Sequence, residues 1–585
     1  MIIRSLLMKI RSLLRHSALL LPAIALLGCS RTASDSTIPG SEAGEVPGIA
    51  VPDYASLQLP EKPNILWLVA EDLSPYIAAY GDSTVPTPNL DRLAAEGVRY
   101  TRLFSPSGVC APSRAAIALG MYPTRAGAMH MRTGPWWDFY HELQDTVWQG
   151  GRRIYEALPP AGTHMHSTLL REAGYYATNH SKQDYQFRAE MTAWDASGDT
   201  AHWRNRTNPA QPFFAIFNFG VTHESQIWGR ANDSLQVPAD LPVKVPPYLP
   251  DTPTVRQDLR RLYSNIVLMD RQVGEILSQL EADGLLDETI IFWYTDHGGV
   301  LPRSKRTLYD TGLQVPLLVR FPGAQLAGQD DGQLLSFVDF KPTLLSLAGM
   351  QPPDGLDGKP WLGRYREPVP REYIHAAADD FDGCCHGRLR AVRDYRYKYI
   401  RNYLPEQPWY QPVPYREQMA SMRELLELQQ AGSLDSIQLQ WFGTGQNPEA
   451  LFDTRADPLE LRNLVSDPAH AAKLGELRRE LDRWIEDTGD LGMQPEREYL
   501  ESIWPGGKQP VTSLPTIGES DEGLALDCAT EGAAIGYQWV VPGGEPKWAW
   551  QPYTGPVSPE PGMELMARAH RIGYVPSKTV RYLPR

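Results

Sequence analysis

Three short and nearly continuous apolar runs constrain the fold of this 585-residue chain more than any other feature. They cover residues 65–70, 213–217 and 289–294. Runs without polar alternation are typical of strands that are buried on both faces of a parallel sheet. Amphipathic helical patterns lie between the runs, at 89–97, with Asn89 as its expected N-cap, and at 265–280. The sequence therefore predicts an α/β fold in which helices cover a large, mostly parallel sheet.

The chain changes character after about residue 370. Alternating apolar residues predict antiparallel strands at 389–393 and 395–401, and helical patterns follow at 417–430 and 471–488. This composition predicts a smaller α+β subdomain over residues 371–505.

A further change comes after residue 505, where the Gly, Pro, Trp and Tyr content rises and the predicted strands become short. We predict an appended all-β accessory domain over residues 506–585. Three of its segments resemble the C-terminal β-sandwich appended to chitobiases: 527–533, 567–569 and 572–577.

The first 29 residues are typical of an export signal. Basic residues precede an apolar run at 18–27, which is too short to span a membrane as a helix. Residues 26–29 resemble a bacterial lipobox, in which Cys29 is lipidated; the alternative is a plain signal peptide with a chance cysteine. We expect a lipoprotein signal peptide at 1–29, a flexible linker at 30–60, and a protein exported to the periplasm or cell surface with a lipid anchor in the membrane.

The net charge of −14 disfavours a nucleic acid as partner, because such a partner requires a basic face. It does not exclude an anionic substrate, since a few local cations decide the field inside a cleft. Three cysteines, Cys384, Cys385 and Cys528, would share an oxidising compartment and cannot all pair with one another. No C-x-x-C spacing indicates a zinc site.

Polar residues follow the predicted strands, where open α/β sheets place their sites. They are Glu71, Asp72, Lys182, His223, Asp296 and His297. Each alone has an ordinary explanation as a helix cap, a hydrogen-bonded histidine or a turn, but their coincidence at four strand ends indicates one site. Carboxylate oxygens favour Ca²⁺ or Mg²⁺ over zinc, although imidazole is not a usual calcium ligand.

The most specific motif begins at a cysteine, in the order Cys110, Ala111, Pro112, Ser113 and Arg114. Pro112 and the following alanines predict a helix that starts at this cysteine, with its N-terminal amides facing any anion that docks there. A buried structural cysteine is the alternative. The pentapeptide matches the C-x-P-S-R signature of type I sulfatases, and residues 71–72, 87–91 and 305–309 follow in family order. The chain thus resembles this formylglycine-dependent family over roughly residues 63–468.

The resemblance implies an alkaline phosphatase-like fold with a mixed, mostly parallel sheet, and makes residues 61–370 the sulfatase catalytic domain. It implies that a maturation enzyme oxidises Cys110 to formylglycine (3-oxoalanine). The implied ligands of Ca²⁺, or of Mg²⁺, are Glu71, Asp72, Cys110 as formylglycine, Asp296 and His297. Arg114 would hold the formylglycine hydrate, while Lys182, His223 and Lys305 would contact the sulfate and His223 or Lys305 would protonate the leaving oxygen.

The sequence departs from the family pattern at three positions. Glu71 replaces the usual aspartate, Leu119 replaces a threonine, and Asp184 replaces a histidine two residues after Lys182. Strand alternation would turn Lys182 and Asp184 toward one face, the sulfate pocket. Asp184 would then act as the base that helps to expel sulfate, or contact a sugar hydroxyl.

The implied substrate is a sulfated polysaccharide or oligosaccharide. The short interval between Asp296 and Lys305 resembles that of the heparan N-sulfatase-like branch. Sulfate esters and N-sulfates therefore both remain candidate substrates. Aromatic residues at 136–140 and 409–410 would stack on sugar rings or simply pack, and His130 and Arg132 are candidate substrate contacts.

Two other functions compete with this interpretation. One is a phosphoryl ester hydrolase of the same superfamily, against which the C-x-P-S-R motif argues. The other is a non-catalytic lipoprotein that binds sulfated glycans, against which the retained Cys110, Arg114 and Lys305 argue.

Overall fold

The computed structural model describes residues 49–131, 155–381, 387–443 and 448–584, together with two short strands, β3 (Trp148–Gln149) and β4 (Arg152–Arg153). The predictions for Cys29, Arg132, residues 136–140, Cys384 and Cys385 lie outside these residues. Among the helices that the structure describes, none combines the length and the apolar character needed to cross a membrane.

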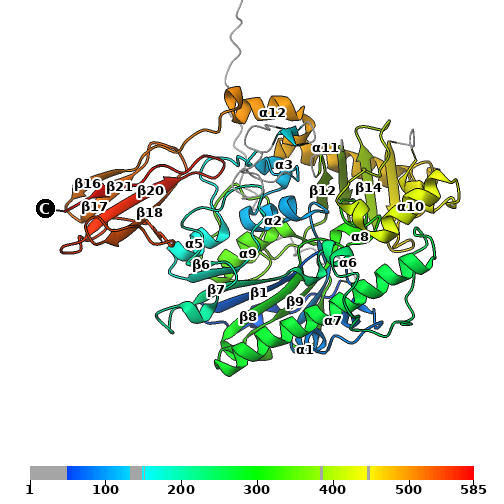
Figure 1. The fold of residues 1–585 in the computed structure, drawn as a ribbon, viewed down its shortest axis with the longest axis horizontal. Helices are drawn as coiled ribbons and strands as arrows, with labels where there is room; N and C mark the ends of the chain where they lie inside the picture. The colour runs from blue at the N-terminus through cyan, green and yellow to red at the C-terminus, as the bar shows by residue number, and fades with distance from the viewer. Residues whose placement is uncertain are drawn as a thin grey trace, which may run out of the picture. The chain divides into compact units, whose positions relative to one another are not determined.

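A nine-stranded sheet forms the centre of the described structure, in the order β10-β2-β9-β8-β1-β7-β5-β6 with β11 beside β2 (Figure 1). Strand β9 runs antiparallel to β2 and β8, and the other pairings are parallel. The strands are β1 (Asn64–Ala70), β2 (Val98–Phe104), β5 (Tyr176–His180), β6 (Ala196–Ser197), β7 (Phe213–Phe219), β8 (Thr289–Thr295), β9 (Gln314–Arg320), β10 (Gln329–Asp331) and β11 (Leu335–Ser336).

Strand β1 shows why its apolar run has no polar alternation. Ile65, Trp67 and Val69 face one core, which also contains side chains of α2 (Cys110–Leu119), α5 (His166–Glu172) and α9 (Phe340–Leu347). Leu66, Leu68 and Ala70 face a second core with α1 (Pro88–Glu96) and α7 (Pro253–Ala282). Helices thus cover both faces of the sheet (Figure 1), which confirms the predicted α/β class.

Two helices begin earlier than the sequence predicted. Helix α1 starts at Pro88 after Thr87, and the side chain of Asn89 instead donates a hydrogen bond to Asp270 Oδ2, 2.8 Å away. Helix α7 starts at Pro253, where the Thr252 side chain accepts a hydrogen bond from the Val255 amide. Proline in the first turn explains both starts, because its missing N–H costs no helical bond there.

A second, antiparallel sheet follows in the order β12-β13-β14-β15, with α11 packed against it. Its strands are β12 (Ile374–Ala378), β13 (Leu389–Arg393), β14 (Tyr397–Asn402) and β15 (Glu449–Asp453). The remaining α-helices of the described residues are α3 (Pro123–Ala126), α6 (Ser225–Gly229), α8 (Asp310–Leu313), α10 (Ala420–Gln430), α11 (Ala471–Thr488) and α12 (Glu496–Ile503). Strand β14 begins two residues later than predicted, because Asp394 Oδ1 accepts hydrogen bonds from the Arg396 and Tyr397 amides and forms a turn.

The strands of the C-terminal region pair antiparallel, which agrees with the predicted all-β character of this part of the chain. One hairpin joins β16 (Thr516–Ser520) and β17 (Gly523–Asp527), and a four-stranded sheet has the order β19-β18-β20-β21. The four strands are β18 (Ala534–Val540), β19 (Gln551–Pro552), β20 (Glu564–His570) and β21 (Val580–Tyr582).

Polar and close-packed contacts join this region to the first domain. Arg171 of α5 donates to the carbonyl oxygens of Trp550, at 2.8 Å, and Thr192, at 2.6 Å. A Cβ atom added at Gly536 of β18 would lie 3.2 Å from Thr192 Cγ2 and 3.3 Å from Met191 Sδ in the first domain, so glycine permits this close approach. The domain boundaries at residues 370 and 505 stay predictions.

Candidate active site

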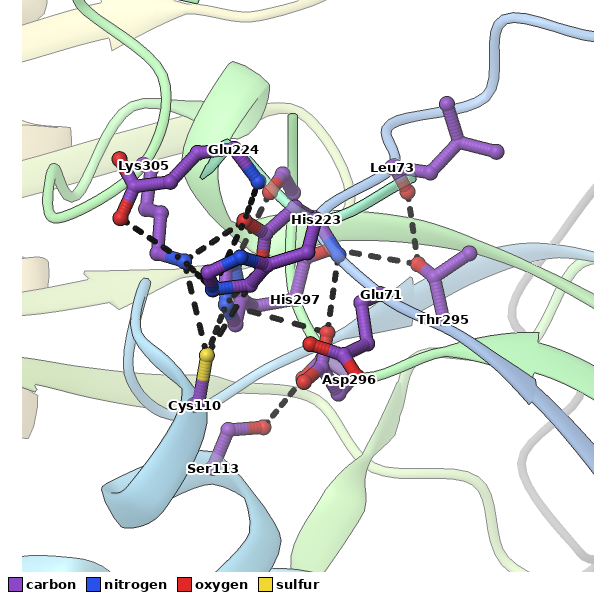
Figure 2. Close-up of polar contacts among 12 residues, drawn as sticks. Glu71, Leu73, Cys110, Ser113, His223, Glu224, Thr295, Asp296, His297 and Lys305 are labelled. Atoms are coloured by element: carbon purple, nitrogen blue, oxygen red, sulfur yellow. Dashed lines mark hydrogen bonds and ion pairs between the residues drawn. The ribbon is translucent and has the colours of Figure 1, made fainter. Parts of the chain in front are cut away.

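The polar side chains predicted at strand ends meet at the carboxyl edge of the central sheet. Glu71 and Asp72 follow β1, His223 follows β7, and Asp296 and His297 follow β8. Figure 2 shows Glu71, His223, Asp296 and His297 near Cys110, the first residue of α2. The parallel order of β8, β1, β7 and β5 brings together residues that lie far apart in the sequence.

Asp72 lies at the centre of this cluster and is fully buried. Its Oδ1 is 2.9 Å from His297 Nε2, and its Oδ2 is 2.6 Å from Lys305 Nζ. Burial raises the pKa of Asp72, but the charges of Lys305, His223 and His297 outweigh burial and hold this pKa well below its usual range. The backbone of Asp72 has a φ of 52°, a left-handed conformation that is uncommon outside glycine. Asp72 is therefore an ionised carboxylate in a constrained turn.

Arg114 connects the α2 helix to the end of β8. Its Nε donates to Asp296 Oδ2 at 2.9 Å, and its Nη1 donates to Asn218 Oδ1 at 2.8 Å. Burial raises the pKa of Asp296, but His297 and Arg114 lower it to about 2. The Nη2 atom of Arg114 is buried and has no partner among the described residues. A buried guanidinium nitrogen without a partner is a donor suited to an anionic or hydroxyl oxygen.

Cys110 lies between the carboxylates and the cations of the cluster. Its Sγ is 3.3 Å from His297 Nε2, 3.5 Å from Lys305 Nζ and 3.8 Å from Asp72 Oδ1. Burial raises the pKa of the thiol, while the charges of Lys182 and Lys305 lower it, and the net pKa is below its usual value. The position is 2% exposed, so a reaction there takes place away from bulk water.

Lysine and histidine side chains surround the same position. Lys182 Nζ lies 2.7 Å from Glu71 Oε2, and His223 Nε2 lies 3.4 Å from Lys305 Nζ. Burial and Lys305 lower the pKa of His223, but Asp72 and a hydrogen bond with Cys110 raise it above its usual value overall. The site therefore gathers several cations, and each of them lies beside a carboxylate.

The structure corrects the reason given for Asp184, though not its location. Strand β5 ends at His180, so Lys182 and Asp184 lie in a loop, where strand alternation does not apply. Asp184 has a φ of 54°. Its Oδ2 still lies 3.6 Å from Lys182 Nζ, at the edge of the cationic group.

Two overlapping groups of side chains could hold a metal ion. One contains Asp72, Cys110, Asp296 and His297, and the other contains Glu71, Asp72, Cys110 and His223, with ligand atoms of each group within 4.8 Å of one another. Carboxylate oxygens suit a hard divalent cation. Burial lowers the pKa of His297, but Asp296 and Asp72 raise it to about 10, so this imidazolium and a metal ion would compete for the same carboxylates.

Sequence reasoning missed three residues that support the cluster: Asn218, Glu224 and Arg306. Glu224 Oε1 lies 3.2 Å from Lys305 Nζ and 2.6 Å from Arg306 Nη2, and the Glu224 amide donates to Asp72 Oδ2 at 2.7 Å. Glu224 thus fixes a lysine on one side and a carboxylate on the other. The sequence could have indicated two of these residues, because Glu224 directly follows His223 and Arg306 directly follows Lys305.

The other residues predicted to contact substrate, His130 and the aromatic residues 409–410, contact neighbouring protein residues in the structure. His130 accepts a hydrogen bond from the Asp380 amide and packs edge-on against Tyr155, so its substrate contact stays a prediction. The two aromatic residues at 409–410 make packing contacts: Trp409 lies against Tyr309, and Tyr410 lies against Trp441 and Phe442.

One exposed aromatic residue lies near the site. The Tyr415 ring is 6.4 Å from the His223 ring, 5.1 Å from the Trp228 ring, and 41% exposed. A sugar ring can stack on such a side chain.

Comparison with known proteins agrees with this geometry. Residues 63–350 match the family described as sulfatase, and residues 302–433 match the C-terminal region described as that of N-sulphoglucosamine sulphohydrolase. An ulvan-active sulfatase of Formosa agariphila (strain DSM 15362 / KCTC 12365 / LMG 23005 / KMM 3901 / M-2Alg 35-1) is 47% identical over 590 residues, which cover 95% of each chain.

Two further matches extend the comparison. The N-sulphoglucosamine sulphohydrolase of Homo sapiens is 24% identical, over 73% of this chain and 90% of that protein. A solved structure in complex with its substrate, D-glucosamine-2-N,6-O-disulfate, shares the fold with a TM-score of 0.51 and 17% identity, over 73% of this chain and 98% of that one. The chain belongs to the sulfatase family, in its heparan N-sulfatase-like branch.

Proposed function

We propose that this sulfatase hydrolyses sulfate esters of a sulfated polysaccharide of the ulvan type, with residue 110 as formylglycine and a Ca²⁺ ion beside it. One observation carries the proposal. The cysteine of the C-x-P-S-R motif lies inside a buried group of carboxylates and cations, in a chain whose similarity to an ulvan-active sulfatase spans nearly its whole length.

The formylglycine and the divalent cation have separate chemical roles in this proposal. The hydrate of formylglycine supplies a hydroxyl nucleophile, and the divalent cation supplies positive charge that favours loss of the hydroxyl proton. Asp72, Asp296 and His297 belong to one of the two groups around Cys110, and Glu71 belongs to the other, together with Asp72. These four residues would hold the cation, with His297 taking part after it loses its proton. The oxygen-rich donor set favours Ca²⁺, with Mg²⁺ as the alternative.

The chain's own cations bind and orient the sulfate. Arg114 Nη2 is a buried donor without a partner among the described residues. Lys305 Nζ lies 3.5 Å from Cys110 Sγ, and the charges of Lys182 and Lys305 both lower the pKa of that thiol. Donors fixed before the reaction stabilise the charge on the sulfate oxygens without reorganisation.

His223 is the best placed proton donor for the departing sugar oxygen. Its side chain is 20% exposed, whereas that of Lys305 is 2% exposed and is held by Asp72 and Glu224. Its raised pKa keeps a proton available near neutral pH. Lys305 would then orient the sulfate while His223 gives the proton.

We further propose that the protein is exported and lipid-anchored through Cys29. The basic residues, the apolar run and the lipobox-like residues 26–29 support this proposal. Metabolic labelling with a palmitate analogue, compared between the parent and Cys29→Ala, tests it, and equal labelling of both would contradict it.

The proposed activity is tested by measuring the sulfate released from ulvan by ion chromatography. The protein should be produced together with a formylglycine-generating enzyme, and Cys110→Ala serves as the inactive control. Glucosamine N-sulfate and 6-O-sulfated glucosamine in the same assay separate N-sulfate from ester hydrolysis. Release of sulfate from ulvan supports the proposal, and release from N-sulfate alone would contradict it.

A further inference from the structure

We propose that a cleft between the loop after β5 and the C-terminal sheet binds a second anionic sugar residue of the polysaccharide that enters the active site. The cleft has a volume of about 470 Å³. The inference rests on the proposed function, because it assumes that the substrate is an anionic polysaccharide rather than a single sugar.

Two parts of the chain form the walls of this cleft in equal shares. The first domain contributes Gln183, Arg188, Ala189, Glu190, Met191 and Trp194, and the C-terminal region contributes Pro546, Lys547, Trp548, Trp550, Arg568 and Thr579. The cleft is a fixed feature, because Arg171 holds the Trp550 carbonyl and pairs with Asp195 at 2.7 Å. Met191 also packs against a small apolar cluster that contains Trp550 and Met566.

Trp548 supplies an aromatic face to the cleft. It is 61% exposed, whereas Trp550 and Trp194 are buried. Its neighbours in the chain are anchored by Gln538, whose side chain accepts from the Lys547 amide at 2.7 Å and donates to the Ala549 carbonyl at 2.9 Å. An exposed indole on an anchored segment loses little conformational freedom on binding and can stack on the apolar face of a sugar ring.

The charge of the cleft is positive. Arg188, Lys547 and Arg568 line it, and burial together with the charge of Arg188 lowers the pKa of Arg568. The carboxylate of Glu190 also lines the cleft, and it is hydrogen-bonded to His164, Thr168 and the Met165 amide. Arg188 Nη2 lies 3.9 Å from Glu156 Oε1, so Lys547 and Arg568 carry the positive charge that an anionic sugar would meet, in a chain that is acidic overall.

Chain connectivity joins this cleft to the active site. Gln183 lines the cleft and stands between Lys182, which pairs with Glu71, and Asp184, which lies beside Lys182. A polysaccharide chain with one sulfate at residue 110 can thus extend along the loop after β5 toward Trp548. A single sugar cannot occupy both places, so the cleft should contribute to binding of polymers and not of small substrates.

The test compares a polymer with a small substrate in exposed-residue variants. Trp548→Ala and Lys547→Glu should each lower kcat/KM on ulvan roughly tenfold, with KM responsible for the change, and leave kcat/KM on 4-nitrophenyl sulfate within about twofold. Leu583→Ala and Lys508→Glu are matched controls, because they make the same kinds of change at exposed positions of the chain outside the cleft.

Binding is measured separately, by affinity electrophoresis in gels that contain ulvan, in a Cys110→Ala background. Trp548→Ala should lose retardation and Leu583→Ala should keep it. Equal retardation of both, or equal losses of kcat/KM on polymer and small substrate, would overturn the inference. If the parent released no sulfate from ulvan but was retarded in a Trp548-dependent manner, the proposed function would fail while the cleft was upheld.

Discussion

The active site and the Trp548 cleft both contain several cations, but the surroundings of these cations differ. In the active site, Asp72, Asp296 and His297 are fully buried and each cation faces a carboxylate. In the cleft, Trp548 is 61% exposed and the lining carboxylate is turned toward its own neighbours. The first arrangement fixes atoms for a reaction, and the second leaves charge for a ligand to neutralise.

The difference separates the residues that carry out the reaction from those that would recognise a long substrate. A charge removed from the buried group leaves its partner without compensation, which is costly in a low dielectric. A charge removed from an exposed cleft is partly replaced by water. Substitutions in the two regions should therefore differ in size and in the kinetic constant that they change.

The largest effect is expected for the buried carboxylates. Asp72→Asn and Asp296→Asn should each lower kcat/KM on every substrate by roughly 1,000-fold or more, because each removes a charge from the group that would hold the cation. Activity assays with and without a chelator, followed by calcium addition, provide the measurement.

Asp270→Asn is the matched control for these variants. Asp270 is also buried, but it caps α1 by accepting from the Leu90 amide at 2.9 Å. Its loss should lower the melting temperature and leave kcat/KM unchanged. Full activity of Asp296→Asn, or of the chelated enzyme, would refute the metal site.

A smaller effect is expected for Glu224, which contacts no reacting atom and positions Lys305 and Arg306. Glu224→Gln should lower kcat roughly 10- to 100-fold with a smaller change in KM, because the two cations lose the charge that separates them. Glu224→Asp should recover part of kcat, and Glu480→Gln, which alters a carboxylate paired with His375 and Arg483, is the control. Unchanged kcat in Glu224→Gln would show that Asp72 alone holds Lys305.

Asp184 should have an effect on the binding of substrate rather than on its conversion. Asp72, His297 and Lys305 contact Cys110 Sγ, while Asp184 pairs with Lys182, at 3.6 Å. Asp184→Asn should raise KM on ulvan roughly 3- to 10-fold and change kcat less than about twofold. Accumulation of a sulfated enzyme in this variant would instead identify Asp184 as the base that expels sulfate.

The smallest effect concerns acid stability, through one buried histidine near each region. Burial lowers the pKa of His166 to about 3 and that of His570 to about 4. Between pH 6.5 and about 4 the unfolded chain binds more protons than the folded chain, so the free energy of unfolding falls as the pH falls. His166→Phe and His570→Phe should each reduce this slope by at most about 1.4 kcal/mol per pH unit. Urea unfolding at pH 7 and pH 5 measures it, and unchanged slopes would contradict the buried neutral histidines.

The sequence predicted what depends on local patterns. The apolar run of β1 fixed the layered α/β class, because burial on both faces removes polar alternation. The motif at Cys110 located the start of α2, since Pro112 suits the first turn of a helix. Lys182 and Asp184 were placed together for the wrong reason, because β5 ends at His180 and a loop with left-handed residues follows.

The rest depends on contacts between distant segments, which single-sequence patterns do not record. Glu224 is recognisable only once the end of β7 meets Lys305 and Arg306. The Trp548 cleft exists only because Arg171 and Gly536 bring the C-terminal sheet against residues 183–194. Isolated Arg and Trp residues carried no signal of such a site.

The central claim, that residue 110 is the nucleophile as formylglycine, is tested most directly by mass spectrometry of the peptide that contains it. A preparation that releases sulfate from ulvan should contain this peptide with an aldehyde at residue 110, and activity should rise in proportion to the aldehyde fraction across preparations. A fully active preparation in which residue 110 is only an unmodified thiol would contradict the account.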